Sequence, residues 1–300
     1  MKEAVPNYYH KFRCIADKCR HNCCIGWEID IDDDTMMLYE NLDTPLGEKI
    51  RANIEGDIPH FRLTDGDRCP LLLENGLCEI IAEYGEDAIC DICYLHPRFK
   101  NFYSNFTETG LGLACEEAAR IVLFEKEKFS IKIPKDAKLT KEEEGFFAKR
   151  KEILDILTDR SVSIYHRLSC LAEKFGQKFQ FSQDELIEKY KSLEILDNAW
   201  LDEINKLKGT KFDGKIFHAD EFQTVFEQLA VYFIFRHLPY GIENGSFEKS
   251  VKFALISCYF IGALFHCNMP ISKEKIIDIV RMYSSEIEYA LENTEGIMML

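Results

Sequence analysis

Cysteines are the residues with the greatest chemical potential in the first hundred positions of this chain. They fall into two groups of four, one within residues 12–30 and one within residues 69–93. The members are Cys14, Cys19, Cys23 and Cys24, followed by Cys69, Cys78, Cys90 and Cys93. Thiols at this density, outside a secreted scaffold, are most often metal ligands. The sequence therefore predicts at least one metal centre in its N-terminal part.

The spacing of the cysteines leaves the identity of the metal open. Cys90 and Cys93 are two residues apart, which lets both thiolates face one ion. The looser intervals between Cys14, Cys19 and Cys23 resemble iron–sulfur loops at least as much as zinc knuckles. Adjacent cysteines cannot easily point at one metal, so the pair at positions 23 and 24 is expected to divide its roles. The eight thiolates could fill two tetrahedral zinc sites, or one 4Fe–4S cluster with cysteines to spare.

Three further cysteines stand alone in amphipathic or apolar segments, namely Cys170, Cys258 and Cys267. A lone cysteine is more often a small buried hydrophobe than a ligand. We therefore predict that these three belong to the core.

Composition excludes some partners and favours others. The net charge of -15 argues against nucleic acid, because a phosphate backbone needs a basic face. The N-terminal segment MKEAVPNYYHKFRC lacks the apolar core of a signal peptide, which predicts a cytoplasmic location, where a reducing environment favours metals over disulfides. The most apolar run, residues 253–265, is too short to span a bilayer, so we expect a buried helix and no membrane partner.

The elements that must position the cysteines are short. An acidic run at residues 30–34 predicts a helix cap before Thr35, residues 45–54 a second short helix, and His60–Leu63 a strand. Asn75-Gly76 between two apolar runs predicts a hairpin that would bring Cys69 and Cys78 together.

The rest of the chain shows helical periodicity almost throughout. The predicted spans are 114–129, 142–158, 161–177, 183–207, 219–237, 247–266 and 272–292. We therefore expect a mainly α protein, with a cysteine-rich module with a short hairpin at residues 1–133 packed on a helical bundle at residues 134–300.

The joint pattern of these blocks resembles a known family. Cysteines 14 to 24 are followed by Gly26-Trp27, then by a Cys-Pro-Leu block, a C-x-x-C and His96-Pro97-Arg98. This order is similar to the CxxxCxxCC metal-chelating cysteine cluster and, more narrowly, to the flagellin lysine N-methylases of the FliB type. Residues 113–120 and 235–238 add to the narrower resemblance. Two departures are Glu116, which stands where the family has proline, and the shorter chain.

The resemblance implies methyl transfer from S-adenosylmethionine to flagellin lysines by a protein that holds a 4Fe–4S cluster, with zinc as the alternative metal and Cys115 as a further ligand. Residues 110–112 lack the third glycine of a dinucleotide fingerprint, so the donor site is expected at the cysteine module. There Arg98 could pair with the donor carboxylate or bond helix-end carbonyls, beside His96, while Trp27 faces the sulfonium. No catalytic base is assigned. A buried amphipathic helix is the favoured interpretation of Glu227–His237. The rival hypothesis is a non-enzymatic protein that binds zinc or iron.

Overall fold

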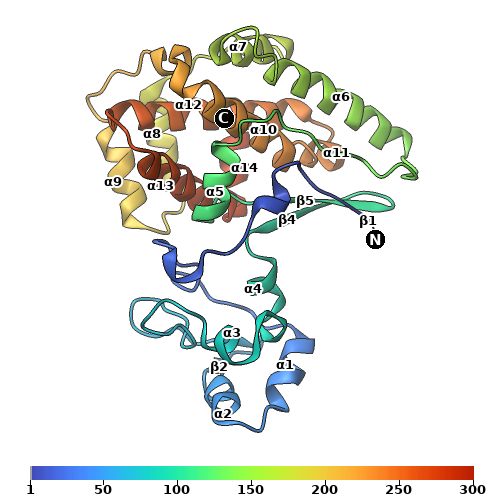
Figure 1. Cartoon of the computed structure of the whole chain (residues 1–300). Helices are drawn as coiled ribbons and strands as arrows, with labels where there is room; N and C mark the ends of the chain where they lie inside the picture. The colour runs from blue at the N-terminus through green and yellow to red at the C-terminus, as the bar shows by residue number, and fades with distance from the viewer. Residues whose placement is uncertain (1) are drawn as a thin grey trace. The chain divides into compact units, whose positions relative to one another are not determined.

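The computed structural model describes residues 2–300, apart from the side chains of residues 243 and 244, and Figure 1 traces the chain. It divides into two compact units. The smaller unit comprises residues 13–98 with 115–117, and the larger comprises the chain up to Phe12, residues 99–114 and residues 118–300. Helices make up most of the regular structure, which confirms the mainly α prediction. The unit boundaries differ from the expected division at residue 133, because the strands after residue 98 group with the helices.

The smaller unit is built from short helices and turns around a compact core. Its elements are α1 (Asp33–Glu40), α2 (Pro45–Ala52), β2 (Ile54–Glu55), β3 (His60–Phe61), α3 (Glu79–Tyr84) and α4 (Asp91–Leu95). Asp32 caps α1 by accepting a hydrogen bond from the Thr35 backbone at 2.9 Å, as the acidic run predicts. Thr44 caps α2 in the same way. The predicted strand at residue 60 is β3, which pairs antiparallel with β2.

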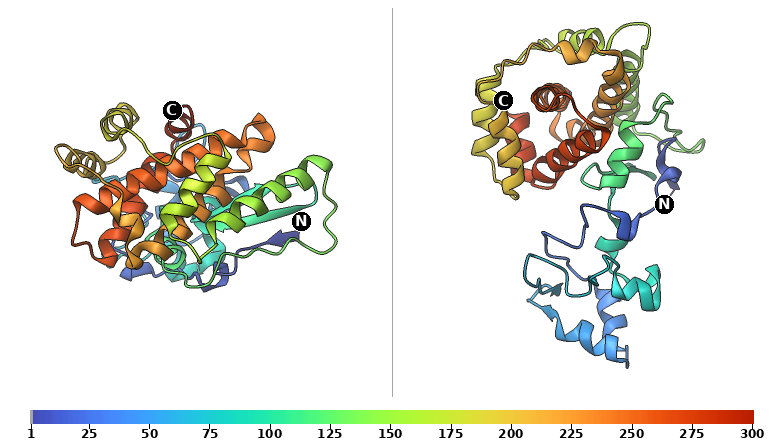
Figure 2. Two further views of the ribbon diagram at one scale, coloured as in Figure 1. Left: turned by 90° about the horizontal axis from the view of Figure 1, so that it is seen from above. Right: turned by 60° about the vertical axis from the view of Figure 1, so that its left-hand side comes forward.

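The larger unit is a bundle of helices, drawn from green to red in Figures 1 and 2. Its longest members are α6 (Lys141–Leu157), α10 (Gln223–His237) and α12 (Phe247–Cys267). The others are α5 (Glu116–Leu123, whose first two residues group with the smaller unit), α7 (Ile164–Lys174), α8 (Gln183–Ser192), α9 (Asn198–Lys206), α11 (Tyr240–Asn244), α13 (Lys273–Tyr283), a π-helix at Ser284–Glu288 and α14 (Leu291–Met298). Helix α10 is buried along nearly its whole length, and α12 packs against it at the centre of the bundle.

A three-stranded sheet in the larger unit was not predicted from the sequence. Its order is β1 (Lys2–Ala4), β5 (Phe106–Leu111) and β4 (Arg98–Phe102), with β1 parallel to β5. Every residue of β5 is buried, including Glu108, whose carboxylate receives two hydrogen bonds from Arg150 of α6 at 2.6 and 2.7 Å. Figure 2 shows α6 running beside this part of the chain. The sequence does not predict this strand, because its polar residues are buried only through contacts with residues far away in the chain.

Several predicted helices are interrupted where distant side chains hold the backbone. The span 183–207 is two helices, since the Glu286 carboxylate accepts from the backbone of Leu196 and Asp197 at 2.9 and 2.8 Å. Asp197 then caps α9 through the Ala199 backbone. The span 272–292 likewise passes from α13 into the π-helix and then into α14.

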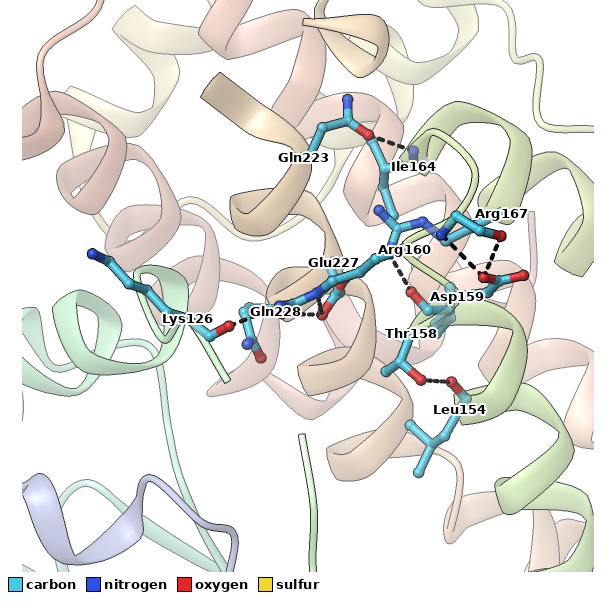
Figure 3. A network of polar contacts seen from close by, with 12 residues as sticks. Lys126, Leu154, Thr158, Asp159, Arg160, Ile164, Arg167, Gln223, Glu227 and Gln228 are labelled. Atoms are coloured by element: carbon cyan, nitrogen blue, oxygen red, sulfur yellow. Dashed lines mark hydrogen bonds and ion pairs between the residues drawn. The ribbon is translucent and has the colours of Figure 1, made fainter. Parts of the chain in front are cut away.

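The helix predicted at residues 114–129 ends at Leu123, because α10 takes up the carbonyl groups that follow. Gln228 donates to the carbonyls of Glu125 and Glu127 at 2.9 and 2.8 Å. Arg160 donates to the carbonyl of Lys126 at 2.8 Å, while its guanidinium also binds Glu227, the centre of the network in Figure 3. These bonds hold the segment after Leu123 against the bundle.

Within the described residues, α12 alone is long and apolar enough to cross a membrane by length and composition. It has 21 residues and extends beyond the predicted apolar run at residues 253–265 at both ends. However, 78% of its most apolar stretch is buried inside the protein, which is the behaviour of a core helix. The predicted burial is therefore confirmed.

Residues 110–112 do not form a nucleotide-binding loop. Gly110 lies within β5, and a side-chain carbon at this position would come within 2.2 Å of Phe99 and 2.7 Å of Phe235. The glycine is required by close packing of the strand. Strand β5 precedes α5, and Gly110 belongs to that strand.

Candidate metal centre

A small cavity in the smaller unit collects thiol groups from four separate segments of the chain. Its volume is about 20 Å³, and its other walls are aliphatic and aromatic side chains. The cysteines that line it are Cys24, Cys69, Cys78, Cys90 and Cys93. The fold therefore brings one member of the first predicted group together with all four members of the second.

Local backbone geometry explains how these cysteines meet. The Cys69 N–H donates to the Cys24 carbonyl at 2.8 Å, which joins the two groups directly. Leu72 and Cys78 form an antiparallel bridge across a tight turn, in which Gly76 has a φ of 81°. The predicted hairpin at Asn75-Gly76 is confirmed as this turn.

The C-x-x-C segment is placed by the start of a helix. Cys90 is the residue before α4, and Cys93 lies in its first turn. The Asp32 carboxylate accepts from the Asp91 backbone at 2.8 Å and so fixes the beginning of α4. Both sulfurs therefore line the cavity.

The protonation of the thiols follows from their burial. Burial raises the pKa of Cys69 to about 11 and also raises the pKa of Cys78. The hydrogen bond between Cys93 and Cys90 raises the pKa of Cys93 and lowers that of Cys90. No lysine, arginine or histidine is among the residues described as lining the cavity. Thiolates here would need an added cation, and a thiophilic metal is the cation that such donors favour.

The adjacent cysteines divide their roles, as expected from their spacing. Cys24 lines the cavity, whereas Cys23 is exposed. The hydrogen bond between the two thiols lowers the pKa of Cys23 to about 7 and raises the pKa of Cys24.

A second set of cysteines lies apart from the cavity lining. Burial raises the pKa of Cys19, and the charge of Glu116 and the neighbouring Cys23 and Cys14 raise it further. The Cys19 sulfur is 3.9 Å from a Glu116 carboxylate oxygen. Half-buried Cys115 directly precedes Glu116 and groups with the same unit.

Glu116 has a clear structural role at the position where the family pattern has proline. Its carboxylate accepts from the Arg20 backbone at 3.0 Å and from the Arg20 guanidinium at 2.8 Å. The glutamate therefore ties the first cysteine loop to the start of α5.

The cysteines meet the requirement of a metal centre for donor type, but they do not meet its requirement for side-chain arrangement. The donors are of the right kind and gather around one cavity. Within residues 2–300, however, no group of three or more His, Cys, Asp or Glu side chains is arranged so that it could hold a metal ion. The residues thus fit a thiophilic centre in donor type, and their rotamers do not close around an ion.

The three predicted cofactor-binding residues lie close to one another beside the cysteines. The rings of Trp27 and His96 are 5.5 Å apart, and the Trp27 indole donates to the Cys23 carbonyl. Arg98 donates to the Tyr94 carbonyl at 3.1 Å, which matches the helix-end alternative for this side chain. Burial and the nearby Arg98 lower the pKa of His96 to about 4, so its ring is neutral at physiological pH.

The lone cysteines behave differently from one another. Cys258 is fully buried in α12, as predicted. Cys267 is half-buried. Cys170 is exposed on α7, so its assignment to the core was wrong, because the outward face of this helix carries the sulfur.

The larger unit contains a buried polar cluster that the sequence did not predict as a cluster. Glu288, in the π-helix, accepts from the Tyr232 hydroxyl at 2.8 Å and lies 2.6 Å from the His237 ring nitrogen. Arg236 donates to the same Tyr232 hydroxyl at 2.8 Å. The favoured interpretation of residues 227–237 as a buried helix is confirmed. The contact of this helix with Glu288 could not be predicted, because Glu288 lies about fifty residues later in the chain.

Residues 210–300, which contain this cluster, match the FliB lysine N-methylase C-terminal domain. The chain is 30% identical over 134 residues to a lysine-N-methylase of Salmonella typhimurium, covering 41% of this chain and 33% of that protein, and equally similar to a lysine-N-methylase of Salmonella choleraesuis. It is 29% identical over 134 residues to a flagellar biosynthetic protein FliU of Salmonella muenchen, covering 79% of that protein. No solved structure matches the chain.

The matched domain and the thiol-lined cavity together describe a cysteine-rich protein with a helical C-terminal domain of the lysine N-methylase type. Over residues 210–300 the chain is therefore similar to the C-terminal domain of the FliB lysine N-methylases. The match spans about a third of the length of the two lysine-N-methylases. The cysteine pattern lies outside the residues that the C-terminal domain matches.

Proposed function

We propose that this chain is a protein-lysine N-methyltransferase that acts on flagellin, with S-adenosylmethionine as donor and an iron–sulfur centre in its cysteine-rich unit. The observation that carries the proposal is the FliB C-terminal domain at residues 210–300, together with relatives that are named lysine-N-methylase. The five thiols around one cavity in the other unit support the metal part of the proposal.

The chain's own residues supply the donor set for such a centre. Cys24, Cys69, Cys78, Cys90 and Cys93 are the first candidates, since they line one cavity without a basic neighbour in the lining. The remaining candidates are Cys14, Cys19, Cys23 and Cys115, of which Cys19 lies beside Glu116. These cysteines would hold the iron–sulfur centre, and the centre would supply a Lewis acid for the amino and carboxylate groups of the donor.

The residues around the cysteines suit the cationic donor in kind. Trp27 presents an aromatic ring beside neutral His96, and a sulfonium is attracted to an aromatic face. Arg98 is occupied with the end of α4 by the bond to the Tyr94 carbonyl. Pairing of Arg98 with the donor carboxylate would therefore have to share or exchange that bond.

The reaction requires a neutral lysine amine. Its lone pair forms the new nitrogen–carbon bond while the carbon–sulfur bond of the donor breaks and the sulfur leaves as a neutral thioether. The amine must lose a proton before the attack, because a protonated lysine has no lone pair. Activity should therefore rise with pH as more substrate lysine becomes neutral, until another group titrates.

Co-expression with the flagellin of the same organism tests the proposal. Intact-mass and peptide mass spectrometry should show lysines heavier by whole methylene units, and purified metal-replete protein with S-adenosylmethionine should reproduce the change. Flagellin that stays unmodified under both conditions would exclude the methyltransferase.

The rival function is a metal-binding protein without catalysis. The thiol-lined cavity favours it equally, since structural zinc uses the same ligands. Anaerobic purification with metal and sulfide analysis separates the two. A brown protein with bound sulfide supports the iron–sulfur centre, whereas a colourless zinc protein that leaves flagellin unmodified supports the rival.

A further inference from the structure

Glu288 differs from two other deeply buried carboxylates of the larger unit in the groups that surround it. Glu108 and Glu227 lie against arginines, which keep their charge at every physiological pH. Glu288 also lies against an arginine, Arg236, but one of its carboxylate oxygens is 2.6 Å from the Nε2 atom of His237. Of these three carboxylates, Glu288 is therefore the one in contact with a group that takes up and releases a proton near neutral pH.

The charges around His237 determine which of its ring nitrogens carries the proton. Burial opposes the ionisation of Glu288, but the charge of Arg236 and the hydrogen bond to His237 lower the pKa of the carboxyl, so it is ionised and can only accept. Burial lowers the pKa of His237, so its ring is neutral at physiological pH. Nε2–H therefore donates to Glu288, and Nδ1 keeps a lone pair that has no hydrogen-bond partner among the described residues. A neutral histidine oriented by a carboxylate is the arrangement of a general base.

The backbone that carries Glu288 is irregular, and side chains of α14 hold it in place. Glu288 is the last residue of the π-helix at Ser284–Glu288, and such turns are rare and occur frequently at functional sites. Asn293 donates to the Glu286 carbonyl at 2.7 Å, and Thr294 donates to the Ile287 carbonyl. These bonds stabilise the turn from which Glu288 reaches His237.

The cluster is buried, yet it reaches the surface of the larger unit. The side chains of Arg236 and His237 keep 13% and 11% of their area exposed. Tyr289, the residue after Glu288, is 43% exposed, and its ring centre lies 5.2 Å from the central carbon of the Arg236 guanidinium. An exposed aromatic ring attracts a cation and also covers an aliphatic stem. A lysine side chain that lies along Tyr289 would bring its amine to the edge of the cluster.

We propose that His237, oriented by Glu288, is the base that accepts the proton of the substrate lysine. The inference rests on the proposed function for the identity of the substrate. One nitrogen–hydrogen bond of the lysine ammonium breaks, its proton bonds to Nδ1 of His237, and the freed lone pair of the amine is available to attack the methyl carbon. Glu288 stabilises the imidazolium until it releases the proton to water.

Arg236 favours this proton transfer. Its charge already balances that of Glu288, so an ammonium at the cluster gains no net attraction and lies near a second cation. A neighbouring cation and exclusion of water both lower the pKa of a lysine amine. The site would therefore hold the substrate amine in its neutral, nucleophilic form. The residues described as lining the thiol cavity of the other unit include no histidine and no carboxylate that could serve instead.

The first test observes the ring of His237 by NMR in the full-length protein labelled with nitrogen-15 histidine. The probe is N-acetyl-lysine methylamide at pH 8, and the matched ligand is N-acetyl-norleucine methylamide, which has the same stem without the amine. His237→Gln identifies the signals of His237, and the exposed His166 is an internal reference. We expect the lysine probe in large excess to shift the Nδ1 signal of His237 and the norleucine probe to leave it in place. A His237 signal that does not move, or that moves equally with both ligands, would overturn the proposal.

The second test compares the pH dependence of flagellin methylation by wild type and His237→Gln, after circular dichroism has shown that the variant is folded. Without the base, reaction depends on lysine that has already lost its proton, so kcat of the variant should rise about tenfold per pH unit between pH 7 and 9. Wild-type kcat should rise less steeply and exceed that of the variant about 100-fold at pH 7. Neither Glu288 nor Arg236, the charged groups that act on the ring, titrates in this range, and α12 places the uncharged Phe253 beside it. A variant profile with the same shape as that of wild type would count against His237 as the base.

The NMR test needs neither metal nor methyl donor, so its result is separate from that of the methylation assay. Methylation of flagellin by a protein whose His237 signal ignores lysine would remove the base and leave the enzyme. A lysine-dependent shift in a protein that fails to methylate flagellin would remove the proposed reaction and keep a site for lysine in the larger unit.

Discussion

The two units differ in whether their buried ionisable groups lie next to a cation. In the larger unit three deeply buried carboxylates lie against cations. Glu108 pairs with Arg150, Glu227 with Arg160 and Arg167, and Glu288 with Arg236. In the smaller unit five thiols surround one cavity whose described lining contains no basic side chain. The larger unit balances these three charges internally, whereas no basic side chain in the described cavity lining would balance a thiolate of the smaller unit.

The pKa shifts follow this difference. Burial opposes the ionisation of Glu288, but Arg236 and His237 outweigh it and lower the pKa of the carboxyl. Burial raises the pKa of Cys69, and no cation in the described cavity lining opposes the rise. An added metal ion would supply the missing positive charge. The contrast predicts that the stability of only one unit depends on metal.

The largest expected effect is therefore the loss of a cavity cysteine. Cys90→Ala and Cys93→Ala should each lower the bound metal of the purified protein and destabilise the smaller unit, because ligand binding and folding are coupled in cysteine sites. Metal analysis and thermal unfolding followed by circular dichroism measure both effects.

The matched control is Cys258→Ala in the core of the larger unit. It should leave the metal content at the wild-type value and cost only the packing of one sulfur atom. An equal loss of metal in Cys90→Ala and Cys258→Ala would contradict the division between ligand and core cysteines.

The next effect concerns a buried ion pair of the larger unit. The Glu108 side chain is fully buried, and Arg150 is nearly so. Glu108→Gln therefore leaves the buried Arg150 guanidinium without a carboxylate partner. Breaking such a pair by removing one partner typically costs about 3 to 5 kcal/mol. Denaturant unfolding monitored at 222 nm (the helical signal) should show this loss, with no change in metal content.

The control for this change is an exposed ion pair of the same helix. Lys151 of α6 binds Asp155 at 2.6 Å, and both side chains are well exposed. Lys151→Ala should cost less than about 1 kcal/mol, since exposed pairs contribute little. Similar losses of unfolding free energy in Glu108→Gln and Lys151→Ala would show that burial of the Glu108 pair does not increase its contribution to stability.

The same contrast explains which parts of the fold could be predicted. Most helices of the larger unit follow from apolar periodicity and capping residues, both of which are local. Strand β5 does not, because Glu108 and Thr109 give its sequence a polar character, and their partners Arg150 and Glu3 lie far away in the chain. The break between α8 and α9 similarly depends on Glu286 from a later helix.

The candidate site was predicted in its residue types and only partly in its arrangement. The turn at Asn75-Gly76 and the C-x-x-C spacing are local signals, so Cys69, Cys78, Cys90 and Cys93 were correctly grouped. That Cys24 lines the cavity while the other cysteines of its group do not could be seen only in the fold.

A smaller effect is expected from the pH dependence of the Glu288 cluster. Burial lowers the pKa of His237, so the folded protein keeps this ring neutral while the unfolded chain protonates near the usual value of 6.5. The pKa of Glu288 is also lowered in the folded state relative to 4.5. Both groups therefore add stability at neutral pH that is lost on acidification, first below about pH 6.5 and then below about pH 4.5.

Urea unfolding at pH 7.0, 5.5 and 4.0 measures this dependence. His237→Gln keeps a hydrogen-bond donor towards Glu288 and cannot titrate, so it should lose less stability than wild type between pH 7.0 and 5.5. His166→Gln, at an exposed position of α7, should follow the wild type. Identical pH profiles for wild type and His237→Gln would exclude His237 as a source of the first loss.

The smallest expected effect comes from two aspartates that cap helices, one in each unit. Asp197 accepts from the Ala199 backbone at the start of α9, and its replacement by alanine should cost about 1 kcal/mol, as is usual for a helix cap. Asp32 caps α1 and also accepts from the Asp91 backbone at the start of α4, next to Cys90. Asp32→Ala should therefore cost more than Asp197→Ala in urea unfolding, and it should also lower metal content, which Asp197→Ala should leave unchanged. Equal costs with unchanged metal content would mean that the bond from Asp91 does not position α4, and that the two units differ in their cysteines and not in the helices that hold them.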